Sequence, residues 1–159
     1  MRVYRTVQDS IVDGPGLRFV VFTQGCTHGC NNCHNPQTHD LLGGTEMSVE
    51  ELVAQMKKNP LTDGLTLSGG EPFLQIEECA SLAKAAKEWG LNVWCYTGYT
   101  LEQLHKMPGA NSLLDEIDVL VDGLFIEAEK SLSLKWRGSK NQRVICLKTG
   151  EEMEGGKCK

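Results

Sequence analysis

Cys26-Thr-His-Gly-Cys30-Asn-Asn-Cys33 is the stretch around which the rest of the chain is organised. Its three cysteines follow directly after the apolar run Phe19-Val20-Val21-Phe22. A loop with this spacing can turn three thiolates toward one point, where they can hold an iron–sulfur cluster or a zinc ion. The choice between these two metals decides which function the sequence predicts.

The composition indicates one compact domain. The chain has 159 residues, of which 40% are apolar, so we expect a single domain over residues 1–159 with a sizeable core. No apolar run approaches the roughly 18 residues of a membrane span, and the N-terminus lacks a signal peptide, which predicts a cytoplasmic protein without a membrane partner. A net charge of -5 argues against a nucleic-acid partner.

The cysteine count favours a metal protein over a disulfide framework. Seven cysteines are present, and four of them lie outside the cluster, at Cys79, Cys95, Cys146 and Cys158. A secreted disulfide scaffold would be shorter and its cysteines would pair. Cys158 falls in the polar, glycine-containing segment 149–159, which we expect to be a loose tail.

The hydrophobic pattern predicts an α/β fold. Buried strands are predicted at 17–23, 64–68, 91–96, 117–122 and 143–147, with helices starting near residues 48, 77 and 100. Strands that alternate with helices indicate βαβ units and a parallel sheet. Because a closed eight-stranded barrel needs more strands, we expect a partial (β/α) barrel of about five or six mostly parallel strands, or an open doubly wound sheet.

Four loops with unusual chemistry follow the predicted strands. They are the cysteine loop, Gly69-Gly70-Glu71-Pro72, Thr97-Gly98 and Asp122-Gly123. In parallel α/β folds, function lies on the loops after the strand C-termini, so we expect these four to meet at one end of the sheet.

The cysteine motif supplies fewer ligands than an iron–sulfur cube usually has. Protein cubes are commonly held by four thiolates, and this motif offers three. One iron would therefore stay open to a small molecule. The alternative is a structural Cys3His zinc site with His28 or His34 as the fourth ligand, although zinc ligands more often come in two pairs separated by a longer loop.

The Gly69-Gly70-Glu71-Pro72 segment also has two interpretations. Its glycines would let a ligand approach the backbone, and its carboxylate could accept a hydrogen bond from an ammonium group. It could equally be a tight turn between a strand and a helix.

Together, the cysteine motif and this segment resemble the radical S-adenosylmethionine enzymes. The resemblance implies that the open iron of a [4Fe-4S] cluster is chelated by the amino and carboxylate groups of S-adenosyl-L-methionine. Reductive cleavage of the S–C5′ bond would then yield a 5′-deoxyadenosyl radical that abstracts a hydrogen atom. The partial barrel would be of the radical S-adenosylmethionine type.

Further motifs resemble the activases of glycyl radical enzymes. They are Asp13-Gly14-Pro15-Gly16-Leu17-Arg18, Tyr96-Thr97-Gly98-Tyr99, 121–125 and 136–142, the last being similar to the branch that activates anaerobic (class III) ribonucleoside-triphosphate reductase. The resemblance covers about residues 5–147. It implies the glycyl radical loop of that reductase as the partner and a reduced flavodoxin-like protein as the electron donor.

The resemblance also implies the site residues. The cluster ligands would be Cys26, Cys30 and Cys33. Contacts to S-adenosylmethionine would come from Asn32, Cys33, His34, Gly69, Gly70, Glu71, Thr97 and Asp122. Many relatives carry an aromatic residue where this chain has Asn32.

Three alternatives stay open. The chain could activate another glycyl radical enzyme, or it could be a radical enzyme that acts on a small molecule. It could also be a zinc-stabilised binding module without catalysis. Trp136-Arg137-Gly138 has no obvious core role and could contact either the cofactor or the partner protein.

Overall fold

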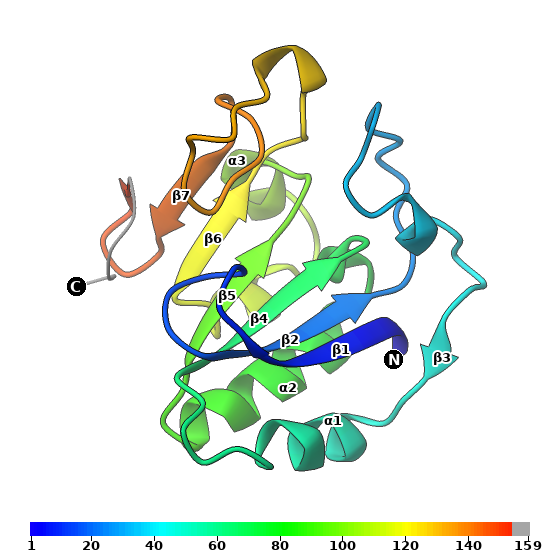
Figure 1. Ribbon diagram of the computed structural model, residues 1–159, viewed down its shortest axis with the longest axis vertical. Helices are drawn as coiled ribbons and strands as arrows, with labels where there is room; N and C mark the ends of the chain where they lie inside the picture. The colour runs from blue at the N-terminus through cyan, green and yellow to red at the C-terminus, as the bar shows by residue number, and fades with distance from the viewer. Residues whose placement is uncertain (154–159) are drawn as a thin grey trace.

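The computed structural model describes residues 1–153, so Cys158 and the end of the predicted loose tail lie outside the described residues. An eight-stranded sheet in the order β3-β1-β2-β4-β5-β6-β7-β8 forms the centre of the molecule (Figure 1). The strands are β1 (Arg2–Ser10), β2 (Arg18–Thr23), β3 (Thr45–Glu46), β4 (Gly64–Gly69), β5 (Asn92–Tyr96), β6 (Val119–Asp122), β7 (Arg143–Cys146) and β8 (Glu151–Glu152). The helices are α1 (Val49–Met56), α2 (Ile76–Glu88), α3 (Leu101–His105) and α4 (Asn111–Leu114), with short 3-10 turns at η1 (Pro36–Thr38), η2 (Pro72–Leu74) and η3 (Glu127–Glu129).

The α/β class is confirmed, but the sheet is mixed. The three central pairings, β2–β4, β4–β5 and β5–β6, are parallel, and the four outer pairings are antiparallel. The prediction of mostly parallel strands is therefore too simple. β7 runs antiparallel to β6, and the segment 123–142 between them holds one short 3-10 turn in place of the helix that usually forms a parallel crossover.

The two ends of the chain add strands that the sequence did not predict. β1 pairs with β2 through two register shifts, so its apolar residues do not alternate regularly. β8 lies inside the segment 149–159 that we expected to be loose, and Glu152 pairs with Ile145. Glu151 and Glu152 thus add a short strand to the edge of β7, and the loose character expected for the segment 149–159 stays a prediction.

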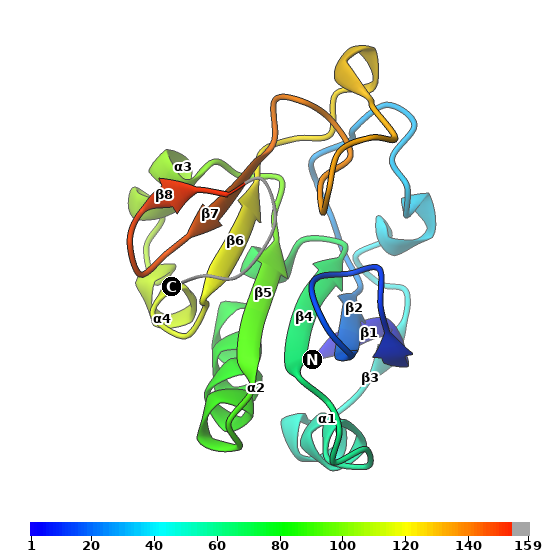
Figure 2. The same ribbon diagram turned by 60° about the vertical axis from the view of Figure 1, so that its left-hand side comes forward.

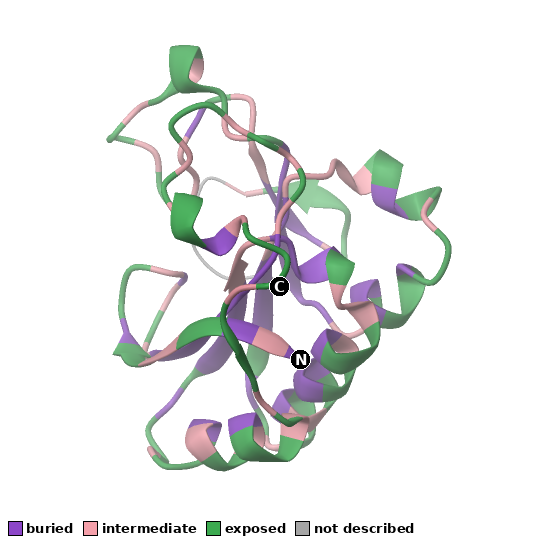
Figure 3. Cartoon of the chain, turned by 90° about the vertical axis from the view of Figure 1, so that its right-hand side faces the viewer, coloured by how far each residue is buried: buried purple, intermediate pink, exposed green. Residues whose placement is uncertain are grey.

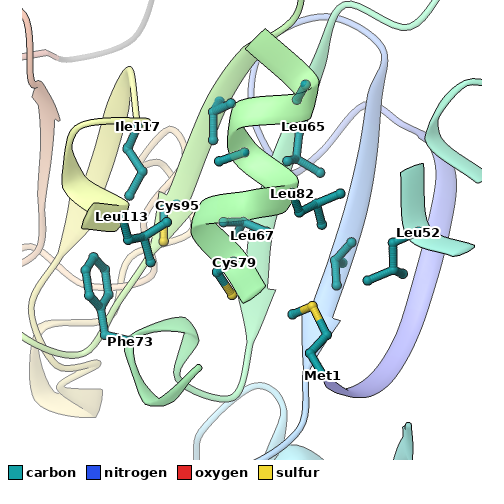
Figure 4. Packing of buried hydrophobic residues seen from close by; sticks show 14 of the residues in the cluster. Met1, Leu52, Leu65, Leu67, Phe73, Cys79, Leu82, Cys95, Leu113 and Ile117 are labelled. Atoms are coloured by element: carbon teal, nitrogen blue, oxygen red, sulfur yellow. The ribbon is translucent and has the colours of Figure 1, made fainter. Parts of the chain in front are cut away.

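Helices cover one face of the sheet and enclose the larger part of the core (Figures 1 and 2). In α2 the buried residues Cys79, Leu82 and Ala86 share one face, as helical spacing requires. Figure 4 shows Cys79 and Leu82 packed beside Leu65 and Leu67 of β4. The outward helix faces are exposed, whereas the strands β2, β4, β5, β6 and β7 are largely buried (Figure 3).

The opposite face of the sheet buries a cation. Arg18 is fully buried, and its guanidinium donates hydrogen bonds to Thr66 Oγ1 and to the carbonyl oxygens of Pro15 and Leu65. It also lies 5.6 Å from the centre of the Trp94 ring. Burial lowers the pKa of Arg18 to about 10. These contacts tie the loop between β1 and β2 to the sheet.

Among residues 1–153, no helix has the length and apolar character that crossing a membrane requires.

A buried ion pair joins β6, β7 and α3. Asp122 is 1% exposed, and its carboxylate accepts from the Arg143 guanidinium and from the backbone N–H of Leu101. Arg143 also donates two hydrogen bonds to Glu102, whose side chain is 65% exposed. The two carboxylates therefore sit in very different surroundings around one cation.

We expect Arg143→Met to lower the free energy of unfolding by about 3 kcal/mol, because it leaves the Asp122 carboxylate buried without its cation. Glu102→Gln is the matched control and should change stability by less than about 1 kcal/mol, since an exposed pair contributes little. Urea denaturation measures both values. Equal losses in the two variants would show that the Asp122 pairing is not the stabilising contact.

Candidate functional site

A cleft of about 550 Å³ opens at the C-terminal end of the parallel strands. The loops that follow β2 and β6 rise on either side of this end of the sheet (Figures 1 and 2). Side chains from five segments line the cleft. The lining residues include Asp13, Cys26, His28, Cys30, Cys33, His34, Ser68, Gly69, Gly70, Tyr96, Thr97, Gly98, Phe125, Trp136, Arg137 and Gly138.

The three predicted ligand cysteines all line this cleft. The loop that carries them is tied down at its base, where Gly25 N–H donates to Thr38 O and Cys26 N–H donates to His39 O. Within it, Gly29 and Asn32 adopt positive φ angles of 64° and 51°, which turn the chain between the cysteines. Within the described part of the chain, no three His, Cys, Asp or Glu side chains are grouped so as to hold a single metal ion.

The donor set suits a cluster of iron and sulfide. Cys26, Cys30 and Cys33 line one cavity and would together offer three thiolates, the ligand type that holds iron–sulfur clusters. Burial raises the pKa of the Cys26 thiol, and the negative charge of Glu71 raises it further. Binding of a metal would have to displace that proton.

The two glycines after β4 line the cleft, and the backbone packed against them leaves no space for a side chain. Gly69 has a φ of 92°, and a Cβ there would lie 2.5 Å from Thr23 N. A Cβ on Gly70 would collide with the carbonyl oxygen of Gly25. Gly70 N–H donates to Thr23 O, so the turn is bonded closely to the end of β2. The tight-turn interpretation therefore explains both glycines, and the approach of a ligand to this backbone stays a prediction.

Glu71 lies beneath the cleft instead of lining it. Its fully buried carboxylate accepts hydrogen bonds from Thr97 Oγ1, from the backbone N–H groups of Gly98 and Phe73, and from His28 Nε2 at 2.6 Å. In this geometry the Glu71 carboxylate does not face the cleft, so it is not placed to contact the cofactor's amino group as predicted. The carboxylate is occupied by donors of the protein.

His28 is a residue whose role the sequence analysis missed. It entered there only as a zinc ligand, and its Nε2 atom is instead engaged with Glu71. Two features of the sequence could have pointed to this contact. His28 lies between Cys26 and Cys30, and Glu71 directly follows Gly69-Gly70. Neither residue alone identifies the other, because 43 positions separate them.

The remaining predicted contacts divide into two groups. His34 lines the cleft with its ring 4.7 Å from the ring of Phe125, and Thr97 lines it as well. Asn32 lies outside, where its amide donates to Glu127. Asp122 also lies outside and is held by the ion pair with Arg143 described above.

The loop over residues 123–142 forms one wall of the cleft. Gln142 holds it together, since its Oε1 accepts from the N–H groups of Gly138 and Ser139 and its Nε2 donates to Gly123 O. Trp136, at a φ of 67°, and the neighbouring Arg137 line the cleft. This position is compatible with either contact predicted for the 136–138 segment.

Comparisons with known proteins agree on one family. Residues 12–145 match the family model described as a 4Fe-4S single cluster domain. The chain is 38% identical to the anaerobic ribonucleoside-triphosphate reductase-activating protein of Vibrio cholerae, over 84% of this chain and 90% of that protein. It is 34% identical to the proteins of the same name from Salmonella typhimurium, over 93% and 100%, and from Escherichia coli K12, over 87% and 94%.

We expect anaerobic reconstitution to load about four irons per chain, as a cube requires. Cys26→Ala, Cys30→Ala and Cys33→Ala should each lose most of this iron, because among residues 1–153 no other cysteine lines the cavity. Cys79→Ala is the control, since Cys79 lies on the buried face of α2 in the core and its replacement should leave loading unchanged. Iron and sulfide analysis measures the result, and full loading of all three cluster variants would contradict the assignment.

Proposed function

This chain belongs to the family of anaerobic ribonucleoside-triphosphate reductase-activating proteins, and we propose that it installs a glycyl radical on that reductase by cleaving S-adenosylmethionine. The observation that carries the proposal is that three thiols and the Gly69-Gly70 turn line one cleft. A cofactor bound there could touch both at once.

Cys26, Cys30 and Cys33 would hold a [4Fe-4S] cluster and leave one iron without a protein ligand. When bound, the cluster supplies the electron that breaks the S–C5′ bond of S-adenosylmethionine at the open iron. The protein's task is to hold the cofactor in place and to exclude water.

The cleft has the size of a small-molecule site, within the usual range of roughly 300–1,000 Å³. We assign the methionine end of the cofactor to the backbone of Gly69 and Gly70, with Thr97 beside it. The adenine end would lie against His34 and Phe125, whose rings are in contact. Asn32, Glu71 and Asp122 would support these contacts from outside the cleft.

The reductase would present its glycine at the mouth of the cleft. Exposed apolar side chains occur in the loops on both sides, with Ile11 and Val12 before β2 and Leu124 and Ile126 after β6. Apolar groups on exposed loops beside a site are typical of a protein-binding surface. We further propose that a reduced flavodoxin-like protein donates the electron and that the reaction takes place in the cytoplasm.

The direct test is anaerobic incubation of the reconstituted protein with S-adenosylmethionine and a reductant. We expect 5′-deoxyadenosine and methionine in equal amounts, and a glycyl radical by electron paramagnetic resonance when the anaerobic reductase is added. Cys33→Ala is the negative control, because it removes a proposed cluster ligand.

The alternatives give different results in the same assay. Formation of 5′-deoxyadenosine without a radical on the reductase would indicate another glycyl radical enzyme or a small molecule as the substrate. Zinc in place of iron, with no cleavage, would indicate a binding module and would overturn the proposal.

A further inference from the structure

Two hydrogen bonds of Glu71 connect the Gly69-Gly70 turn to two different positions in the cysteine loop. At the base of the loop, Glu71 N–H donates to Gly25 O at 2.8 Å. Three residues further along, between Cys26 and Cys30, the His28 imidazole reaches the Glu71 carboxylate at 2.6 Å. The loop is also bonded to residues 38 and 39 at its base and, through Asn32, to Glu127, but the two bonds to Glu71 are the ones that set its position relative to the Gly69-Gly70 turn.

We propose that His28 is a positioning residue, which sets the cluster loop at a fixed distance from the Gly69-Gly70 turn so that one molecule of S-adenosylmethionine can engage both. The inference rests on the proposed function. It concerns the side chain of His28 and assigns that residue no contact with the reacting atoms.

The role of His28 can be tested separately from that of the Glu71 carboxylate, because the carboxylate has other hydrogen-bond donors. Thr97, Gly98 and Phe73 all donate to Glu71, and they belong to the turn after β4 and to the end of β5. Of the hydrogen bonds that the Glu71 carboxylate accepts within residues 1–153, the one from His28 is the one that reaches the cysteine loop. Removal of the imidazole would therefore release the loop while the carboxylate keeps its other donors.

Packing holds the imidazole in one place. A Cβ on Gly98 would lie 2.5 Å from Cδ2 of the His28 ring, so only glycine fits beside it. Another part of the ring meets Tyr99 in an edge-on contact with the ring centres 4.6 Å apart. The side chain of His28 is 13% exposed. Because the ring is confined in this way, its bond to Glu71 holds the cysteine loop at a fixed distance from the Gly69-Gly70 turn.

A cofactor that spans two loops is sensitive to the distance between them. A displacement of about 1 Å between binding groups is enough to weaken a preorganised site strongly. The three cysteines still belong to one loop when His28 is removed, so the cluster should form. The expected defect lies in the affinity for S-adenosylmethionine and not in the iron content.

The first variants to test are His28→Ala and His28→Gln, with His105→Ala as a control at the exposed end of α3. We expect His28→Ala to bind iron as the wild type does, and to raise the Kd and KM for S-adenosylmethionine about tenfold. His28→Gln keeps an N–H donor and should recover most of the affinity. Titration of the reduced cluster's electron paramagnetic resonance spectrum with S-adenosylmethionine measures the Kd.

A second variant disturbs the contact between His28 and Glu71 without replacing His28. Gly98→Ala should push the imidazole away from Glu71 and reproduce the weaker binding. If it acts through His28, it should add nothing further in a His28→Ala background, which a double-mutant cycle measures. Additive losses would mean that the new methyl group obstructs the cleft directly, and would count against the proposal.

Two further outcomes would overturn the inference. Wild-type affinity in both His28→Ala and Gly98→Ala would show that the contact sets no distance, and loss of iron in His28→Ala would make His28 part of the cluster site. The wild-type protein is assayed first for 5′-deoxyadenosine. Absence of cleavage there would reject the proposed function, whereas cleavage with unaffected variants would reject only the role of His28.

Discussion

The site depends on one buried carboxylate and the donors around it. Glu71 is fully buried, and its hydrogen bonds join the turn after β4, the end of β5 and the cysteine loop. A buried carboxylate is tolerated when it is well hydrogen-bonded, so the donors of these three segments are held together around Glu71. The arrangement of the cleft is thus a consequence of satisfying one charge.

The other constraint is the close approach of backbone at the ends of β2 and β4. Gly69 and Gly70 leave no room for side chains against Thr23 and Gly25, which brings the start of the cysteine loop directly beside the turn. The opposite wall is fixed by different means, through the amide of Gln142 and its bonds to its own loop. A cleft with both walls fixed in this way needs little rearrangement to receive a ligand, and preorganisation of this kind lowers the cost of binding.

Local signals in the sequence were enough to predict the α/β class, the helix starts and the grouping of loops at one end of the sheet. The helices predicted to start near residues 48 and 100 are capped by the Ser48 and Thr100 side chains, and each capping bond joins residues only three positions apart. The environments of Glu71 and Asp122 were not predictable, since the long-range partners of Glu71 are 26 to 43 positions away and Arg143 is 21 positions from Asp122. β1 escaped prediction because its register shifts break the alternation of apolar residues.

The central claim is that three thiols hold a cube whose remaining iron is open to S-adenosylmethionine. Mössbauer spectroscopy of protein reconstituted with isotopically enriched iron tests it most directly, because it resolves the coordination of individual irons. The account predicts that a single iron of the cube changes its isomer shift when S-adenosylmethionine is added, while the others do not. A spectrum that is unchanged by the cofactor in a fully loaded sample would contradict it.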